Sequence, residues 1–270
     1  MKIKCSNSVC GKEFNKCFAD IKRTKRSYCS LKCAYYDRDH HVKNKDFFET
    51  IDTEAKAYWL GFIYADGNLS SSMNRVKIEI ALKDILHLKK FANIFNASIV
   101  EFEHKGFVRG SSNPGPFYGC RCDVCSRTLW QSLHKIGIEP RKSKKDLTKV
   151  FDYVPGDLMH HFIRGEFDGD GSICFNKNTA MCSFNGGYKF LTEIKNKILS
   201  YLPLTDVKIV PMSSIYRLQW TGLPQLRLIR KWLYKDATLF LERKKKVFNS
   251  IESKLERKVS SQFRGVSWRV

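Results

Sequence analysis

Hydrophobic and polar positions along residues 50–250 form a series of helical and strand-like patterns that occurs twice in the same order. Apolar residues three and four apart predict helices, and alternating or short apolar runs bounded by Gly, Pro, Ser and Asn predict strands. The expected helices cover residues 54–65, 84–95, 128–136, 157–171, 188–202 and 224–234. The expected strands cover residues 75–82, 98–104, 117–125, 172–175, 179–184, 207–210 and 216–220. The pattern predicts an α+β fold with two αββαββα subdomains, residues 50–139 and 157–250.

Three further segments lie outside this repeat. Residues 1–48 are rich in cysteine, residues 140–156 start with a basic stretch that links the two copies, and residues 251–270 form a basic tail. A further basic helix is expected to start at Lys244, Lys245 and Lys246. We therefore expect two subdomains with a small N-terminal segment and a C-terminal tail.

Charge indicates the kind of partner. The 270 residues include 48 Lys+Arg and 27 Asp+Glu, which gives a formal net charge of +21, and 13% of the residues are aromatic. Abundant aromatic residues argue for a folded protein rather than a disordered polycation. Such a charge excess favours a phosphate polymer, and so a nucleic acid, although a generally solvated basic surface is the alternative. No apolar run is long enough to cross a bilayer and no signal peptide is evident, so we expect an intracellular, cytoplasmic protein without a membrane partner.

The N-terminal cysteines have the spacing of a metal site. Cys5, Cys10, Cys29 and Cys33 form two close pairs separated by a short loop, which suits four thiolate ligands around Zn²⁺. A segment this short needs such a metal for its stability, and its pattern resembles a treble-clef or zinc-ribbon finger. Two disulfides are the alternative. A second group, Cys120, Cys122 and Cys125, is better explained as small side chains of a strand, because only the remote His134 offers a fourth ligand.

The first helix of each copy ends in a related nonapeptide, WLGFIYADG (59–67) and IRGEFDGDG (163–171). Small residues lie four apart in both, at Gly61 and Ala65 and at Gly165 and Gly169, so the two helices can pack backbone against backbone. We expect Gly67 and Gly171 to end the helices in the left-handed conformation. This packing would bring Asp66 and Asp170 side by side.

Two adjacent carboxylates at the negative ends of two helices repel each other unless cations lie between them. Their hard oxygen ligands favour Mg²⁺, and this arrangement suits phosphodiester hydrolysis. The alternative is that Asp-Gly simply ends each helix. Lys142 and Lys244 follow the last helix of each copy at similar distances from these acids, and we expect them either to assist catalysis or to grip phosphate.

These two motifs, their separation and the order of elements resemble those of the single-chain, two-motif LAGLIDADG homing endonucleases. The resemblance implies that Asp66 and Asp170, with Gly67 and Gly171 beside them, hold Mg²⁺ or Mn²⁺ at the active site. It also implies a monomer with saddle-shaped antiparallel sheets that cuts a long, asymmetric double-stranded DNA target and leaves short 3′ overhangs. Members of the family are encoded by mobile introns, inteins or free-standing genes in phages and organelles. The motifs depart from the family pattern at several positions, including Tyr64, Arg164 and Glu166.

Polar residues on the strands and basic residues near them are the candidate DNA contacts, since such side chains read base edges or bind phosphates. These candidates are Arg75, Lys77, Lys83, Arg141, Lys144, Lys145, Arg217, Gln219 and Lys245. A non-cleaving nucleic-acid-binding protein or an intron RNA maturase on the same fold is the alternative function. The final residues, SSQFRGVSWRV, resemble the opening of an Apetala-type DNA-binding domain, and we expect the N-terminal finger to act as an accessory DNA clamp.

Overall fold

A computed structural model describes residues 1–104, 116–140, 147–175 and 180–250. The chain forms two compact units, one of residues 1–49 and 68–134 and the other of residues 50–67 and 135–270. The first helix of the repeat therefore belongs to the same unit as the second copy. Among the described residues, no helix combines the length and apolar character needed to cross a membrane. The basic residues 141–146 and the C-terminal tail lie outside the described residues.

The N-terminal segment of the first unit is small and contains few buried residues. Strands β1 (Lys2–Lys4) and β2 (Glu13–Asn15) form an antiparallel pair, and helices α1 (Phe18–Arg23) and α2 (Leu31–His41) follow. The hydroxyl of Ser30 caps α2 by accepting a hydrogen bond from the backbone N–H of Cys33 at 3.2 Å. The helix therefore starts within the second cysteine pair.

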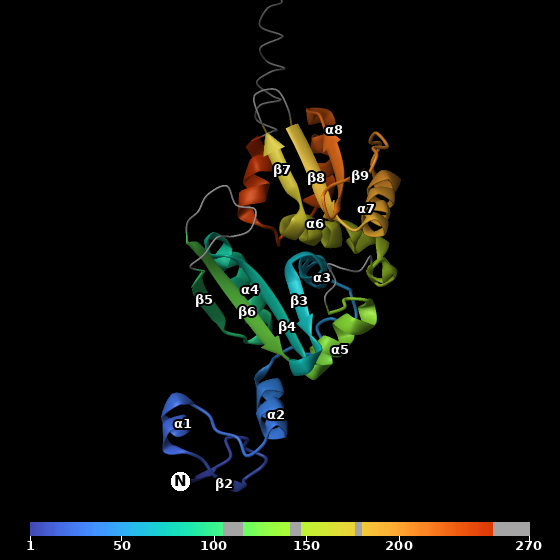
Figure 1. Cartoon of the computed structure of the whole chain (residues 1–270). Coiled ribbons are helices and arrows are strands. Elements are labelled where there is room, and N and C mark those ends of the chain that lie inside the picture. Colours follow the sequence, from blue (N-terminus) through green and yellow to red (C-terminus); the bar gives the residue numbers. More distant parts are fainter. Residues whose placement is uncertain (105–115, 141–146, 176–179, 251–270) are drawn as a thin grey trace, which may run out of the picture. The chain divides into compact units, whose positions relative to one another are not determined.

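The first copy supplies a four-stranded sheet to the same unit (Figure 1). Its strands β3 (Gly67–Ser70), β4 (Arg75–Ala81), β5 (Ile99–His104) and β6 (Phe117–Cys125) lie in the order β3-β4-β6-β5. Helix α4 (Ile85–Phe95) packs on this sheet through Leu88, Phe91 and Phe95, which are fully buried. Helix α5 (Arg127–Ile136) and the 3-10 turns η1 (Ser71–Met73) and η2 (Leu82–Asp84) complete the copy.

The second unit contains the two motif helices and the second sheet (Figure 1). Helix α3 (Glu54–Asp66) packs along α6 (Met159–Asp170), and the 3-10 turns η4 (Lys149–Asp152) and η5 (Gly156–Leu158) precede α6. Strands β7 (Ser172–Phe175), β8 (Ala180–Gly186), β9 (Val210–Pro211) and β10 (Tyr216–Thr221) lie in the order β7-β8-β10-β9. Helices α7 (Tyr188–Tyr201) and α8 (Leu223–Leu233) pack on this sheet, and residues 242–250 are helical.

Both sheets have the same strand order when the strands of each copy are numbered along the chain, first-second-fourth-third. This shared topology confirms the predicted α+β fold with a repeated supersecondary unit. Strand β3 was not among the expected strands of the first copy, because it has only four residues and little alternation. The strand expected over residues 207–210 is wrong, since β9 covers only Val210 and Pro211. The last helix begins at residue 242, slightly before the predicted lysines.

Candidate active site and metal centre

The two motif helices meet along the predicted line of small residues. A methyl group at Gly61 would lie 2.9 Å from the backbone carbon of Phe162 and closer still to its carbonyl oxygen. A methyl group at Gly165 would meet the carbonyl of Tyr58 in the same way and lie 2.9 Å from the backbone nitrogen of Phe62. Only a glycine hydrogen fits at either position. The expected backbone-to-backbone packing of α3 and α6 is therefore confirmed.

The two glycines that end these helices do not have the expected conformation. Gly67 has φ −77° and ψ 152°, and Gly171 has φ −72° and ψ 160°, so both are extended and the predicted left-handed ends are wrong. A methyl group at Gly67 would lie 2.5 Å from the carbonyl oxygen of Ile63, and one at Gly171 would lie 2.6 Å from that of Phe167. Glycine is needed for space, because the chain passes directly from each helix into a strand.

Asp66 and Asp170 are the last residues of α3 and α6. Gly169 directly precedes Asp170 in the chain. A methyl group added at Gly169 would lie 3.4 Å from the carboxylate oxygen Oδ2 of Asp66, so the Asp66 carboxylate lies close to the end of α6. Asp66 is half-buried and Asp170 is exposed. Two hard carboxylates at the same end of the helix pair are ligands suited to Mg²⁺ or Mn²⁺ rather than to a soft metal. The carbonyl oxygen of Gly171 already accepts a hydrogen bond from Lys244 at 2.7 Å, which weakens the expectation that it also binds the cation.

Lys244 does not lie where a phosphate could reach it. Only 5% of the residue is exposed, and its ammonium donates to the carbonyl oxygens of Phe167, Asp168, Gly169 and Gly171. An ammonium at this position satisfies the last carbonyls of α6 and interacts favourably with the negative end of the helix dipole. Burial lowers the pKa of Lys244 from its usual value. The expectation that Lys244 contacts the scissile phosphate is therefore wrong for this structure. Lys142 lies outside the described residues and stays a prediction.

A buried polar network surrounds the second motif, and its partners were not predicted from the sequence. Arg164 has no exposed surface, and its guanidinium lies 2.6 Å from the carboxylate of Glu54 on α3. The same guanidinium donates to the carbonyl oxygens of Leu233 and Leu239 at 2.7 and 2.8 Å. Glu54 also accepts from the backbone N–H groups of Thr238 and Leu239. The network therefore joins both motif helices to the segment that follows α8.

Asp168 forms a second part of this network. Its Oδ2 accepts from the hydroxyl of Tyr58 at 2.8 Å and from the backbone N–H of Leu241 at 2.7 Å. Complete burial raises the pKa of this carboxyl to about 6. The charged residues Arg164, Glu166 and Asp168 inside a buried helix were the sequence signal for such a network, because buried charges need partners.

The four N-terminal cysteines lie together, and their ligand atoms are all within 4.8 Å of one another. The Sγ atoms of Cys10 and Cys29 are 3.5 Å apart, and those of Cys29 and Cys33 are 3.6 Å apart. Tetrahedral Zn²⁺ with Zn–S bonds of about 2.3 Å would place its sulfurs roughly 3.8 Å apart, whereas a disulfide needs about 2 Å. The four thiols thus fit a zinc site, and none of the four forms a disulfide. Cys120 and Cys122 are buried strand residues, as expected.

The open face of the first sheet holds opposite charges in pairs. Arg75, Lys77 and Glu79 share this face with Arg121 and Asp123 across the register of β4 and β6. Asp123 lies 3.6 Å from Arg75 Nε and 3.3 Å from Arg121 Nε, and Lys77 Nζ lies 2.8 Å from Glu79. The face is therefore less positive than its predicted basic residues alone suggest. Acidic side chains of this kind hold arginines in place or accept hydrogen bonds from bases.

The described residues of the second sheet place fewer charges on its open face. Arg217 Nε donates to Asn185 Oδ1 at 3.2 Å, and Gln219 pairs with Ser183 on the neighbouring strand. Lys83 is exposed in η2, whereas Lys245 is half-buried with its ammonium 3.5 Å from the ring centre of Phe240. Arg141, Lys144 and Lys145 lie outside the described residues and stay predictions.

The sequence matches no protein-family model and no curated protein. Among solved structures, the chain is similar to the homing endonuclease I-WcaI bound to its DNA recognition sequence, with a TM-score of 0.52 and 10% identity over 78% of this chain and 90% of that one. It is also similar to the I-LtrWI LAGLIDADG homing endonuclease bound to target DNA, with a TM-score of 0.49 and 9% identity over 80% and 92% of the two chains. The N-terminal LAGLIDADG domain of DUF199/WhiA gives a TM-score of 0.48 and 14% identity over 78% and 95%. The likeness to I-WcaI shows the fold alone, which is LAGLIDADG endonuclease-like.

Proposed function

We propose that this protein is a site-specific DNA endonuclease that hydrolyses phosphodiester bonds with Mg²⁺ or Mn²⁺. The observation that carries the proposal is the glycine-lined packing of α3 and α6, which ends in Asp66 and Asp170 at the same end of the helix pair. A protein that only bound nucleic acid would gain nothing from two carboxylates held together at the negative ends of two helices. The fold, shared with I-WcaI, is compatible with this reading.

The residues of the chain have distinct roles in this proposal. Asp66 and Asp170 hold the divalent cation, and when bound that cation supplies water activation and stabilisation of the leaving oxygen. The helix seam sets the separation of the two acids, and Lys244 is a positioning residue because it satisfies the carbonyls just before and after Asp170. Lys142 stays a candidate for contact with the phosphate.

We propose duplex DNA with an asymmetric sequence as the substrate. The two sheets present different side chains in their described parts. Lys77 pairs with Asp123 in the register of the first sheet, whereas Arg217 pairs with Asn185 and Gln219 with Ser183 in the second. A protein whose two halves read different bases recognises a site without two-fold symmetry. A single chain with both motifs needs no second copy to supply the acids, so we propose a monomer that leaves short 3′ overhangs. We further propose an intracellular location and a mobile genetic element as the source of the gene.

Cleavage of a randomised duplex library with Mg²⁺, followed by sequencing of the cut ends, tests this function. We expect a single enriched site of more than a dozen base pairs and staggered cuts near its centre. The matched variants Asp66→Asn and Asp170→Asn keep the side-chain volume and should bind the enriched duplex without cutting both strands. Specific binding with no cutting by the wild type at any divalent metal would support the alternative, a non-cleaving binder, and intron RNA splicing would then be assayed.

A further inference from the structure

The N-terminal segment is fixed against one end of the first sheet within the first unit. Asp39 on α2 accepts a hydrogen bond from the backbone N–H of Arg127 at 3.1 Å, and its other oxygen lies 3.1 Å from Lys45 Nζ. The side chain of Asn44 donates to the carbonyl of Ile94 at 2.7 Å. The ring of Phe47 packs edge-on against that of Phe95. Helix α2 is therefore held in one place beside the point where β6 ends and α5 begins.

This arrangement leaves an open groove of about 510 Å³ between α2 and the end of the sheet. Lys32, Tyr35, Tyr36 and Asp39 line it from α2, and Met73, Asn74, Cys125, Ser126 and Arg127 line it from the end of the sheet. We call these nine residues the α2 groove. Tyr35 is 37% exposed and Tyr36 is 48% exposed, so both rings are accessible to a partner.

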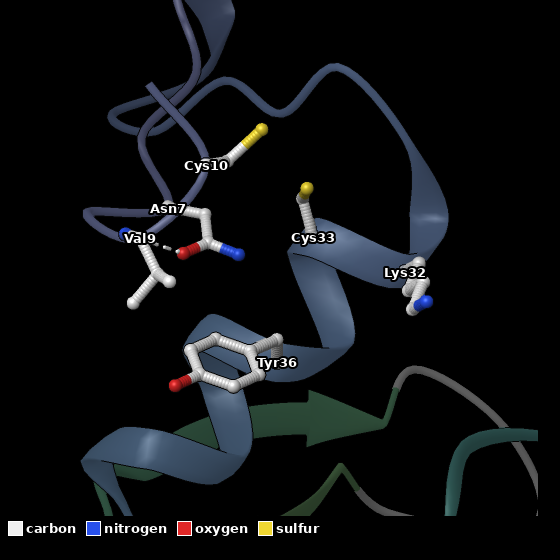
Figure 2. Close-up of a pocket in the computed structure, with 6 residues that line it drawn as sticks. All are labelled: Asn7, Val9, Cys10, Lys32, Cys33 and Tyr36. Carbon is white, nitrogen blue, oxygen red and sulfur yellow. Dashed lines mark hydrogen bonds between the residues drawn. The ribbon is translucent and has the colours of Figure 1, made fainter. Parts of the chain in front are cut away.

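A second hollow of about 300 Å³ continues the α2 groove toward the zinc ligands (Figure 2). It shares Lys32 and Tyr36 with the groove, and Asn7, Val9 and the ligand residues Cys10 and Cys33 also line it. Figure 2 shows Tyr36 on α2 after Cys33, with its ring below Asn7 and Val9. The turn that carries Cys10 thus forms one wall of a continuous surface, and zinc would keep this wall in place.

The chemistry of the α2 groove favours a polyanion. Its accessible side chains offer an ammonium, a guanidinium, two phenol hydroxyls and an amide, which are groups that commonly bind DNA phosphates. Its one carboxylate, Asp39, is already held by Lys45 and by the backbone N–H of Arg127. The first 49 residues contain 12 Lys or Arg and 6 Asp or Glu. Two of those acids are already paired, Asp37 with Arg26 at 2.7 Å and Asp39 with Lys45. The surface near the groove therefore has a positive balance.

The α2 groove is also continuous with the open face of the first sheet. Cys125 lines the groove and pairs with Arg75 in the register of β4 and β6, and Asp123 lies two residues earlier on the same strand. A duplex lying along that face would reach the α2 groove where β6 ends. We propose that the α2 groove binds the phosphate backbone of duplex DNA beyond the stretch that the first sheet covers. This inference rests on the proposed function for the identity of the partner.

The test measures how tightly the full chain binds its target duplex over a range of salt concentrations. Mg²⁺ is left out so that the DNA stays intact. Lys32→Ala/Arg127→Ala removes two charges from the α2 groove, and Lys22→Ala/Lys25→Ala removes two exposed charges from the same segment outside it. Each lost phosphate contact lowers the slope of log affinity against log salt by about 0.9. We expect the groove variant to lower the slope by about 1.8, to bind tenfold or more weakly at about 0.1 M salt, and to shorten the hydroxyl-radical footprint on one side.

Equal slopes and footprints for the groove variant and the wild type would overturn the inference. The proposed function would still stand if the wild type cuts its duplex, so the two failures are distinguishable. Tyr35→Phe/Tyr36→Phe removes only the two hydroxyls, and we expect a several-fold loss of affinity with unchanged thermal unfolding. A third outcome is that the wild type binds a poly-glutamate peptide and that Lys32→Ala/Arg127→Ala abolishes this binding but leaves DNA binding unaffected. That outcome would assign the α2 groove to an acidic protein and overturn the DNA assignment.

Discussion

Replacing Gly61 with alanine is the most direct test of the packing that brings the two acids together. The added methyl group would meet the carbonyl oxygen of Phe162 and lie 2.9 Å from the backbone nitrogen of Glu166. Both obstacles are backbone atoms, so no change of rotamer relieves the clash and the two helix axes must separate. The same argument applies to Gly165→Ala against the backbone of Tyr58 and Phe62.

The expected loss of stability follows from two opposing effects. Overpacking in a core costs about 1–3 kcal/mol, and a backbone obstacle favours the upper end of that range. The higher helix propensity of alanine offsets about 1 kcal/mol of this cost, because glycine is less favourable than alanine by that amount in a helix interior. The net loss is about 2 kcal/mol, which corresponds to a fall in Tm of about 4–8 °C for a chain of this size. Once one substitution has opened the seam, the second costs less, so the double variant should lose less than the sum of the single losses.

Thermal unfolding followed by circular dichroism measures this effect, with Gly186→Ala as the control. A methyl group at Gly186 would lie 3.5 Å from the ring of Phe190, an ordinary contact, so this variant should unfold within about 1 °C of the wild type. Separation of the acids should also slow cleavage by about a hundredfold, because misplacement of about 1 Å has effects of that size. A Gly61→Ala protein that unfolds at the wild-type temperature or above it would refute the seam argument.

Four further predictions concern single residues. Asp66→Asn and Asp170→Asn should each reduce double-strand cleavage by at least about a thousandfold in a plasmid assay while duplex affinity changes little, and full activity in either would exclude that acid. The purified chain should contain one zinc per molecule by atomic emission and Cys29→Ser should lose it, whereas equal zinc contents would contradict the site. Lys244→Met should lower the free energy of unfolding by about 1–3 kcal/mol in urea titrations, because buried carbonyls lose their donor, and an unchanged midpoint would contradict this. Burial raises the pKa of Asp168 to about 6 in the folded chain, so its stabilising contribution is complete below the unfolded pKa near 4 and is lost as the pH rises through 6. The unfolding free energy of Asp168→Asn relative to that of the wild type should therefore rise by about 2 kcal/mol between pH 4 and pH 7, and a constant difference would refute this sign.

Most of the fold could be predicted from the sequence because its helices and long strands have strong periodic patterns. The helix seam followed from Gly61 and Gly165, since small residues at fixed offsets have few other uses in an apolar helix. Strand β3 was not predicted because the formation of a four-residue edge strand depends on pairing with its neighbour β4 rather than on its own sequence pattern. The conformation of Gly67 was mispredicted because glycine is needed both for left-handed backbone and for close approach, and sequence alone does not separate the two.

The role of Lys244 could not be read from the chain for a related reason. A lysine after the last helix of a basic protein usually lies in solvent, and only the tertiary structure reveals that this one lies under the end of α6. The network around Arg164 and Asp168 joins residues more than 60 positions apart, so no local sequence pattern predicts it. The charged positions were visible in the second motif, but their partners were not.

The allocation of α3 to the second unit has a consequence for how such a protein changes over time. Both acids, the seam between their helices and the buried ion network belong to one compact unit, whereas the first sheet and the four-cysteine segment belong to the other. In the proposed endonuclease, substitutions that change base preference on the first sheet would therefore lie outside the unit that contains the two acids. A lineage of the proposed endonuclease could thus acquire new target sites by changes in one unit while selection preserves the other.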